Sequence, residues 1–329
     1  MKEIKSDNYS IWLGENSLSK LDISGYSKVA ILVDKNTKRN CLPKLPQLEN
    51  SIIIEIKSGE EYKTINTCNF IWKQLTAHHF DRNSLLINLG GGVIGDMGGF
   101  AASTYKRGID FIQVPTTLLA MVDASVGGKL AIDFNGLKNQ VGLYSNPELV
   151  IINPIFLQTL AEEELKSGFA EVVKHALITD KNLWKELTST AFDKLNWEAI
   201  ILTSIQIKNK IVLSDPFEKG NRKKLNFGHT FGHAIESYYL EKGTPVLHGE
   251  AVLMGILLEV EISLVSQEQN NEIKNYILSN FSLPFTPKKS DLLPFLMNDK
   301  KNKVGKINFT LLTNIGSCSV DNLFSTDEL

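Results

Sequence analysis

Histidine and glutamate side chains in the second half of the chain are well suited to binding a metal ion. His229 and His233 are four residues apart within Asn226–Glu236, so a helix would place both on one face. This spacing is a known zinc-binding geometry, but Thr230 stands where a metalloprotease carries its catalytic glutamate. The pattern therefore predicts a metal site of a different kind from that of a metalloprotease.

A catalytic zinc site needs three protein ligands and one open position, which two histidines and one carboxylate would supply. Glu171 is the best carboxylate, because it lies among small and apolar residues where an unpaired negative charge is costly. The alternative is that Glu171 pairs with Lys174 or His175 across one helical turn. A third histidine, His248, opens the next helical stretch.

A glycine-rich loop, Gly90–Asp96, follows an apolar run that is typical of a buried strand. Gly90, Gly92 and Gly95 spell G-x-G-x-x-G, and such glycines let the backbone approach a phosphate at the start of the next helix. The usual dinucleotide fingerprint follows the first strand of its fold, whereas at least two strands precede this loop. We expect a dinucleotide here in another geometry. The alternative is that the glycines serve only a tight turn and helix–sheet packing.

Several basic residues lie beside glycine or asparagine, or in stretches that do not resemble exposed amphipathic helices. A phosphate or carboxylate substrate needs such donors, although for each residue alone a solvated surface charge is the alternative. These residues are Arg107, Lys129, Lys138, Lys174, Lys208, Arg222, Lys300 and Lys301.

The elements that must position these residues differ between the two halves of the chain. The first half alternates apolar runs with helical patterns, which favours a parallel α/β sheet. The predicted strands are Lys28–Asp34, Ser51–Ile56, Ser84–Leu89, Phe111–Val114 and Leu149–Asn153. The predicted helices between them include Thr64–His79 and Asp96–Ser103.

After Pro154 the apolar periodicity is mainly helical, with one late β-rich stretch at Ile307–Leu312. We therefore predict an α/β domain over residues 1–155 and a mainly helical domain over residues 156–329. The predicted helices of the second domain are Leu160–Thr179, Lys181–Thr188, Trp197–Leu213, Gly228–Tyr239, His248–Glu268 and Asn271–Asn280.

The composition excludes some classes of protein. With 35 basic and 37 acidic residues the net charge is −2, which offers no general attraction to nucleic acid or to an anionic membrane. The three cysteines lack metal-type spacing, and no apolar run reaches the ~18 residues of a membrane span. The amino terminus has no apolar signal-peptide core, so we expect a cytoplasmic protein.

Together these motifs resemble the 3-dehydroquinate synthase family, within the sugar phosphate cyclases. The resemblance spans most of the chain in the family's order, and the joint pattern is specific although no single piece is. The matching segments are Ser58–Lys63, Gly90–Asp96, Tyr105–Gly108, Pro115–Lys129, Ser167–His175, Arg222–Glu236, His248–Ala251 and Asp299–Lys301.

The resemblance implies a Rossmann-like amino-terminal domain, a helical carboxy-terminal domain, and a divalent metal, most often zinc with cobalt as an alternative. It assigns the metal to Glu171, His229 and His248, and it moves His233 to the substrate. The implied substrate-binding residues are Arg107, Asp123, Lys129, Asn139, Lys174, Lys208, Arg222, Asn226, His233 and Lys300.

The resemblance also implies an NAD site in the amino-terminal domain. The first of its implied residues lie at and just after the end of the first predicted strand. Others make up Ser58–Lys63 and Gly92–Asp96, and the rest lie between residues 116 and 159. They are Asp34, Asn36, Ser58, Gly59, Glu60, Glu61, Tyr62, Lys63, Gly92, Val93, Ile94, Gly95, Asp96, Thr116, Thr117, Lys129, Lys138, Phe156, Leu157, Gln158 and Thr159.

The chemistry that the resemblance implies is a phosphate-eliminating lyase reaction of the shikimate pathway, which leads to the aromatic amino acids. NAD+ oxidises a ring hydroxyl of 3-deoxy-D-arabino-heptulosonate 7-phosphate, phosphate is eliminated, the ketone is reduced again, the ring opens, and an aldol step closes 3-dehydroquinate. A homodimer is expected on the same grounds. The alternatives are another sugar phosphate cyclase, a metal-dependent NAD polyol dehydrogenase, and an inactive NAD- or metal-binding descendant.

Overall fold

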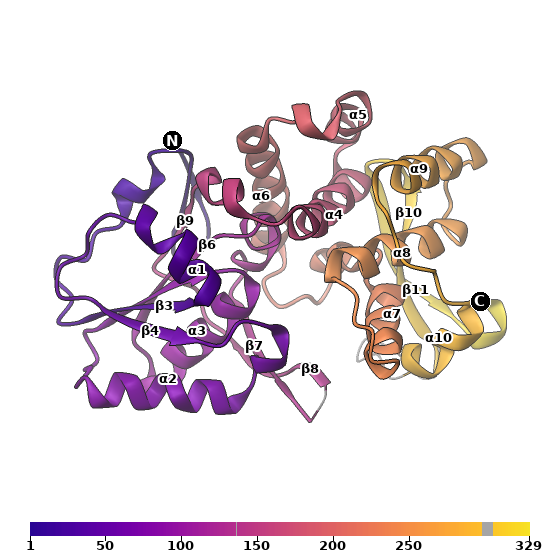
Figure 1. Cartoon of the computed structure of the whole chain (residues 1–329). Coiled ribbons are helices and arrows are strands. Elements are labelled where there is room, and N and C mark those ends of the chain that lie inside the picture. Colours follow the sequence, from indigo (N-terminus) through magenta and orange to yellow (C-terminus); the bar gives the residue numbers. More distant parts are fainter. Residues whose placement is uncertain (136, 298–304) are drawn as a thin grey trace. The chain divides into compact units, whose positions relative to one another are not determined.

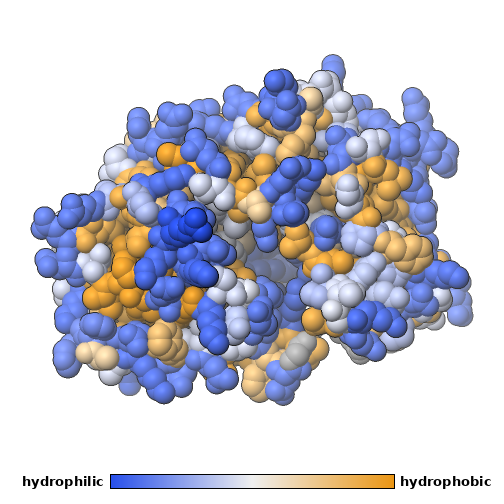
Figure 2. All heavy atoms as spheres, viewed as in Figure 1, coloured by the Kyte–Doolittle hydropathy of each residue, from blue (hydrophilic) through white to orange (hydrophobic). Residues whose placement is uncertain are grey.

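The computed structural model describes residues 1–135, 137–297 and 305–329. The chain divides into two compact units, Met1–Ala161 and Glu162–Leu329, which Figure 1 shows in indigo to magenta and in magenta to yellow. Among the described helices, none is both long and apolar enough to span a bilayer. Figure 2 shows hydrophilic side chains over much of the face it presents, interrupted by hydrophobic areas.

The first unit is built on a mixed sheet in which, among the described residues, seven strands follow the order β1-β2-β9-β6-β5-β3-β4. β1 and β2 pair antiparallel, and every other neighbouring pair in the sheet is parallel. The strands are β1 (Lys2–Lys5), β2 (Ser10–Leu13), β3 (Val29–Asp34), β4 (Ile52–Ile56), β5 (Leu85–Gly90), β6 (Asp110–Pro115) and β9 (Leu149–Ile152).

Helices cover this sheet because its central strands are apolar on both faces. All six residues of β5 are buried, and Leu32 and Leu86 of the sheet share a core with Ile71 and Met97 of the helices. The hairpin of β7 and β8 contributes Leu130 to the same core. These further elements are α1 (Lys35–Asn40), α2 (Ile65–Ala77), α3 (Gly92–Thr104), β7 (Lys129–Phe134) and β8 (Leu137–Tyr144).

The second unit is mainly helical, and among its described residues one β-hairpin, β10–β11, contributes to the core. Phe231 of α7 and Leu292 of α10 pack with Ile307 and Phe309 of the hairpin. Its elements are α4 (Glu162–Thr179), α5 (Lys181–Ser189), α6 (Trp197–Ser214), α7 (His229–Glu241), α8 (His248–Glu261), α9 (Gln267–Asn280), α10 (Lys289–Leu296), β10 (Ile307–Asn314) and β11 (Ser317–Phe324).

The predicted fold class is confirmed, and one predicted helix is wrong. The predicted helix over His248–Glu268 is broken: α8 ends at Glu261 and α9 begins at Gln267. The break arises because Leu264 N donates to Leu312 O at 2.9 Å, which draws the chain out of the helix toward β10. Ser266 then caps α9 by accepting from Gln269 N at 3.2 Å. Periodicity alone could not show this, because the competing partner lies far along the chain.

Candidate functional site

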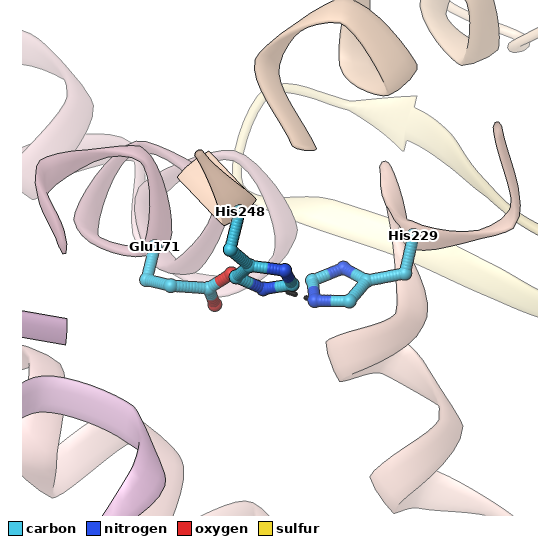
Figure 3. A group of neighbouring side chains, drawn as sticks. All are labelled: Glu171, His229 and His248. Carbon is cyan, nitrogen blue, oxygen red and sulfur yellow. Dashed lines mark ion pairs between the residues drawn. The ribbon is translucent and has the colours of Figure 1, made fainter. Parts of the chain in front are cut away.

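Glu171, His229 and His248 come from three helices and converge in the second unit (Figure 3). Glu171 lies within α4, whereas the two histidines are the first residues of α7 and α8. Glu171 Oε1 is 3.4 Å from His229 Nε2 and 3.6 Å from His248 Nε2. One ligand atom from each residue lies within 4.8 Å of the other two.

These distances fit a divalent transition metal. Ligand atoms held tetrahedrally at about 2.0–2.1 Å from a zinc ion lie roughly 3.4 Å from one another. One carboxylate oxygen and two imidazole nitrogens are also the donor set of catalytic zinc sites. The arrangement can therefore hold a zinc or cobalt ion with a position open for an oxygen of a bound molecule.

The outer nitrogens of both imidazoles face oxygen acceptors, as metal-binding histidines usually do. His229 Nδ1 is 3.1 Å from Phe227 O, and His248 Nδ1 is 3.4 Å from Glu236 Oε1. A proton on Nδ1 would serve these contacts and leave Nε2 as the ligand atom. Sequence reasoning missed Glu236, because the histidine it faces, His248, lies twelve residues further along at the start of another helix.

Glu171 uses its two carboxylate oxygens differently. Oε1 faces the histidines, whereas Oε2 forms an ion pair with Lys174 Nζ one helical turn away. The pairing with Lys174 that the sequence allowed as an alternative is therefore present, and it leaves the other oxygen directed at the imidazoles. Glu171 and Lys174 are both almost fully buried.

The pKa values of the two histidines are shifted in opposite directions. Burial, and then the positive charge of Lys174, lowers the pKa of His229 well below its ordinary value, although Glu171 opposes this. Burial also acts to lower the pKa of His248, but the charge of Glu236 and hydrogen bonds to Glu171 and Glu236 outweigh it and raise the pKa to about 10. Without a metal, His248 thus holds a proton that a metal ion would have to displace.

Close helix packing at small residues brings these ligands together. Gly249, next to His248, donates its N–H to Ser167 Oγ at 3.0 Å, and a Cβ at Gly249 would overlap the Ser167 backbone. Likewise, a Cβ at Gly255 would overlap backbone atoms of Gly228 and Gly232. α8 can therefore approach α4 and α7 closely only because glycine stands at these two positions.

The predicted substrate residues of the second unit are mostly buried. Lys174, Lys208 and Arg222 are 1%, 5% and 3% exposed, so they are not solvated surface charges. Asn226 Nδ2 donates to Glu218 Oε1 at 2.7 Å, and the His233 ring centre lies 5.4 Å from that of His229. His233 therefore lies beside the cluster of Glu171, His229 and His248 without being one of its three residues.

The predicted substrate residues of the first unit are more exposed. Arg107, Lys129 and Asn139 are exposed, and Asp123 is half-buried. Arg107 lies with Asp81, Arg82 and Lys106 along a surface pocket. Lys300 lies outside the described residues.

The glycine loop runs from β5 into α3, with Gly91 preceding the first turn of the helix. The loop borders a pocket whose lining also includes Asp96, Gln113, Pro115, Ala120, Ala124 and Ser125. A Cβ at Gly92 would make only an ordinary contact with Ala124 at 3.5 Å. The first amides of α3 therefore start beside a pocket, in the arrangement that suits a phosphate.

Other glycines of the same helix serve packing. A Cβ at Gly98 would overlap the side chains of Asn88 and Leu32, and one at Gly99 would overlap Leu130. Packing therefore explains Gly98 and Gly99, which follow the loop, whereas the loop itself borders a pocket. Its amino-terminal end adjoins a pocket, and the later glycines admit neighbouring strands.

A buried lysine connects the loop to another predicted site residue. Lys63 Nζ donates to Asp96 Oδ2 at 2.6 Å and to Asn139 Oδ1 at 2.8 Å. Asn139 N in turn donates to Asp133 Oδ1 at 2.7 Å. Lys63 therefore fixes the β7–β8 hairpin against the start of α3.

The remaining predicted NAD residues have mixed surroundings. Asp34 Oδ1 accepts from Thr37 N at 2.8 Å and so caps α1. Thr116 and Phe156 are buried, whereas Asn36 is exposed. Ile94 is also buried. The half-buried residues include Ser58, Glu60, Tyr62, Val93, Gly95, Thr117 and Leu157. The exposed residues are Gly59, Glu61, Lys138, Gln158 and Thr159.

Comparison with known sequences covers both units. The family model described as 3-dehydroquinate synthase N-terminal matches residues 53–167, and the one described as 3-dehydroquinate synthase C-terminal matches residues 168–302. The chain is 42% identical to the 3-dehydroquinate synthase of Parabacteroides distasonis, over 92% of this chain and 90% of that protein. It is also 42% identical to that of Campylobacter concisus, over 97% of this chain and 93% of that protein.

Solved structures share the fold. A 2-deoxy-scyllo-inosose synthase complexed with carbaglucose-6-phosphate, NAD+ and Co2+ superposes with a TM-score of 0.83 at 25% identity, over 98% of this chain and 95% of that one. The 2-epi-5-epi-valiolone synthase of Streptomyces hygroscopicus, with NAD+ and Zn2+ bound, gives 0.86 at 23%, over 100% and 96%. An iron-containing alcohol dehydrogenase of Thermotoga maritima gives 0.66 at 14%, over 100% and 97%.

Proposed function

The chain belongs to the 3-dehydroquinate synthase family, and we propose that it converts 3-deoxy-D-arabino-heptulosonate 7-phosphate to 3-dehydroquinate and phosphate. It is then a lyase of the shikimate pathway that uses NAD+ and a divalent metal. The observation that carries the proposal is the convergence of Glu171, His229 and His248 with both outer imidazole nitrogens facing acceptors.

The three ligands hold the metal, and the residues around them set its environment. A metal bound there would supply a Lewis acid for a substrate oxygen, and a bound NAD+ would supply reversible hydride chemistry. Phe227 O and Glu236 orient the two imidazoles, and Lys174 holds the second oxygen of Glu171. His233, beside His229, is placed to hold a proton near a bound substrate.

We assign NAD to the first unit, at the start of α3. Gly91, Gly92 and Gly95 line a pocket at this helix start, where a phosphate would suit, and Lys63 donates to the carboxylate of Asp96. Asp34 and the residues at 58–63, 116–117, 138 and 156–159 complete the proposed site.

The buried cations of the second unit support an anionic substrate. Lys174, Lys208 and Arg222 are almost fully buried rather than solvated at the surface, although Lys174 already pairs with Glu171 and Arg222 Nη1 donates to Pro216 O at 2.6 Å. We propose that they bind the phosphate and carboxylate of the substrate, with Asn226 as a further donor. Arg107, Asp123, Lys129, Asn139 and Lys300 are proposed to contribute as well.

Two further assignments rest on the resemblance to the family. We propose that the enzyme is a homodimer and that it acts in the cytoplasm. Size-exclusion chromatography with light scattering tests the first, and fractionation of cells that produce the protein tests the second.

Phosphate release is the most direct test of the proposed reaction. Purified protein with NAD+ and Zn2+ or Co2+ should release inorganic phosphate from the heptulosonate phosphate, with no net accumulation of NADH. Release only from phosphorylated sugars that lack the carboxylate would identify another cyclase instead. Steady NADH formation with a simple polyol would identify a dehydrogenase.

A further inference from the structure

The amino terminus of α7 is capped by a side chain from another helix. The first N–H groups of a helix have no partner within it, and Gly228, which precedes α7, has no side chain to supply one. Glu259 of α8 fills this role. Its Oε2 accepts from Gly228 N at 2.6 Å, and its Oε1 accepts from Thr230 N at 3.1 Å and Phe231 N at 3.2 Å.

Glu259 is fully buried, so its carboxylate depends on these hydrogen bonds rather than on water. The residue is 0% exposed, and a buried carboxylate is costly unless hydrogen bonds offset its lost hydration. Three backbone donors and the positive end of the α7 dipole provide that compensation.

Glu259 bonds to the backbone on both sides of the proposed metal ligand His229. His229 lies between Gly228 and Thr230, and Glu259 holds the backbone N–H groups of both neighbours. Gly228 itself adopts a left-handed conformation with φ 78°, and a Cβ there would overlap Ile256 of α8. The backbone that carries the His229 side chain is therefore fixed on both sides by α8, the helix that begins with the ligand His248.

We infer that Glu259 is a positioning residue for the metal ligand His229. It acts through the backbone of residues 228–231 rather than by touching the metal, and it links the two histidine ligands through one rigid helix. The inference rests on the proposed metal site. Sequence reasoning missed Glu259, because it follows two leucines in an apolar run and lies 30 positions after His229.

Metal affinity of a Glu259→Gln variant tests the inference. Glutamine presents an NH2 group to backbone donors, so the cap should loosen and His229 should lose its fixed position. In Co2+ titrations of chelator-stripped protein, we expect affinity to fall about 10-fold, the lower end of the range for residues that orient metal ligands. The visible absorption bands of bound Co2+ should change shape, which loss of stability alone would not cause.

Three further variants serve as comparisons for Glu259→Gln. Glu259→Asp keeps the charge and should restore part of the affinity. Glu261→Gln lies on the same helix but removes only exposed ion pairs to Lys274 and Lys289, so it should bind Co2+ as the wild type does. Leu187→Ala, in the buried face of α5, should lower the melting temperature while leaving Co2+ affinity unchanged.

The outcomes separate the inference from the proposed function. Wild-type protein that binds no Co2+ would overturn the metal site itself. Wild-type binding with unchanged affinity and spectrum in Glu259→Gln would overturn only the role of Glu259. Should Glu259→Gln not fold, hydrogen exchange of the wild type decides: Co2+ should slow exchange at the amides of Gly228, Thr230 and Phe231, and unchanged rates would overturn the inference.

Discussion

The glycine loop, Gly90–Asp96, and the metal group, by which we mean Glu171, His229 and His248, show two ways of building a site. The loop is one continuous stretch, Gly90–Asp96, and several of its residues line a pocket where β5 ends and α3 begins. The metal group takes one side chain from each of three helices, spread from residue 171 to residue 248. The first depends on local backbone freedom, whereas the second depends on how closely separate helices can pack.

The largest expected effect comes from removing a ligand in the metal group. Glu171→Gln replaces the oxygen that faces both histidines with an amide group and leaves Lys174 without its charged partner. We expect metal affinity and phosphate release to fall by more than about 100-fold, beyond the range for residues that only orient ligands. Calorimetric metal titration and the phosphate assay measure both. Normal metal binding and turnover would refute the ligand assignment.

Helix packing should matter almost as much as the ligands. Gly249→Ala would force α8 away from the Ser167 backbone and so move His248 relative to Glu171. We expect about 2 kcal/mol lower stability, in the range for overpacking, and metal affinity lower by about 10-fold. Denaturant unfolding and Co2+ titration report these. Gly232→Ala is the matched control, because its Cβ would have its nearest neighbour at 3.3 Å, and equal losses in both variants would contradict this account.

Metal binding should depend on pH, because one ligand is protonated in the metal-free protein. The raised pKa of His248 means that the folded protein binds an extra proton between pH 6.5 and about 10. The stability from this proton is therefore present below pH 6.5 and is lost as pH rises through about 10. Metal must displace the proton, so affinity should rise up to about tenfold from pH 7 to pH 8. A flat affinity profile would show that His248 is already neutral.

The smallest effect should separate the two kinds of glycine in α3. Gly92→Ala has room for its Cβ, so stability should change by less than about 1 kcal/mol while the KM for NAD+ rises several-fold. Gly98→Ala would overlap Asn88 and Leu32 and should cost about 1–3 kcal/mol with less effect on that KM. Thermal unfolding and steady-state kinetics distinguish them. The opposite assignment of effects would show that the pocket beside Gly92 is not the NAD site.

Much of the fold could be predicted because its signals are local. β3, β4, β5, β6 and β9 coincide with predicted apolar runs to within about two residues at each end, as expected for buried strands. The sequence predicted a break between two helices, but it placed the break after Glu268, whereas α8 ends at Glu261 and α9 begins at Gln267. The true position depends on a hydrogen bond from Leu264 to the distant β10. The β7–β8 hairpin was missed as well, because β8 is exposed along most of its length and shows no buried run.

The sequence by itself determined which side chains and glycines were available for metal and dinucleotide chemistry, and its ordered motifs determined the family. Only the tertiary structure decided that Glu171 divides its two oxygens between Lys174 and the histidines. It also decided that Glu236 faces the imidazole of His248 and that Glu259 accepts from the backbone N–H groups on both sides of His229. The reason is physical. Residue types and spacing report contacts within one or two helical turns, whereas these contacts join α4, α7 and α8. Those helices can approach closely only because glycines at single positions lack a Cβ that would overlap the neighbouring backbone.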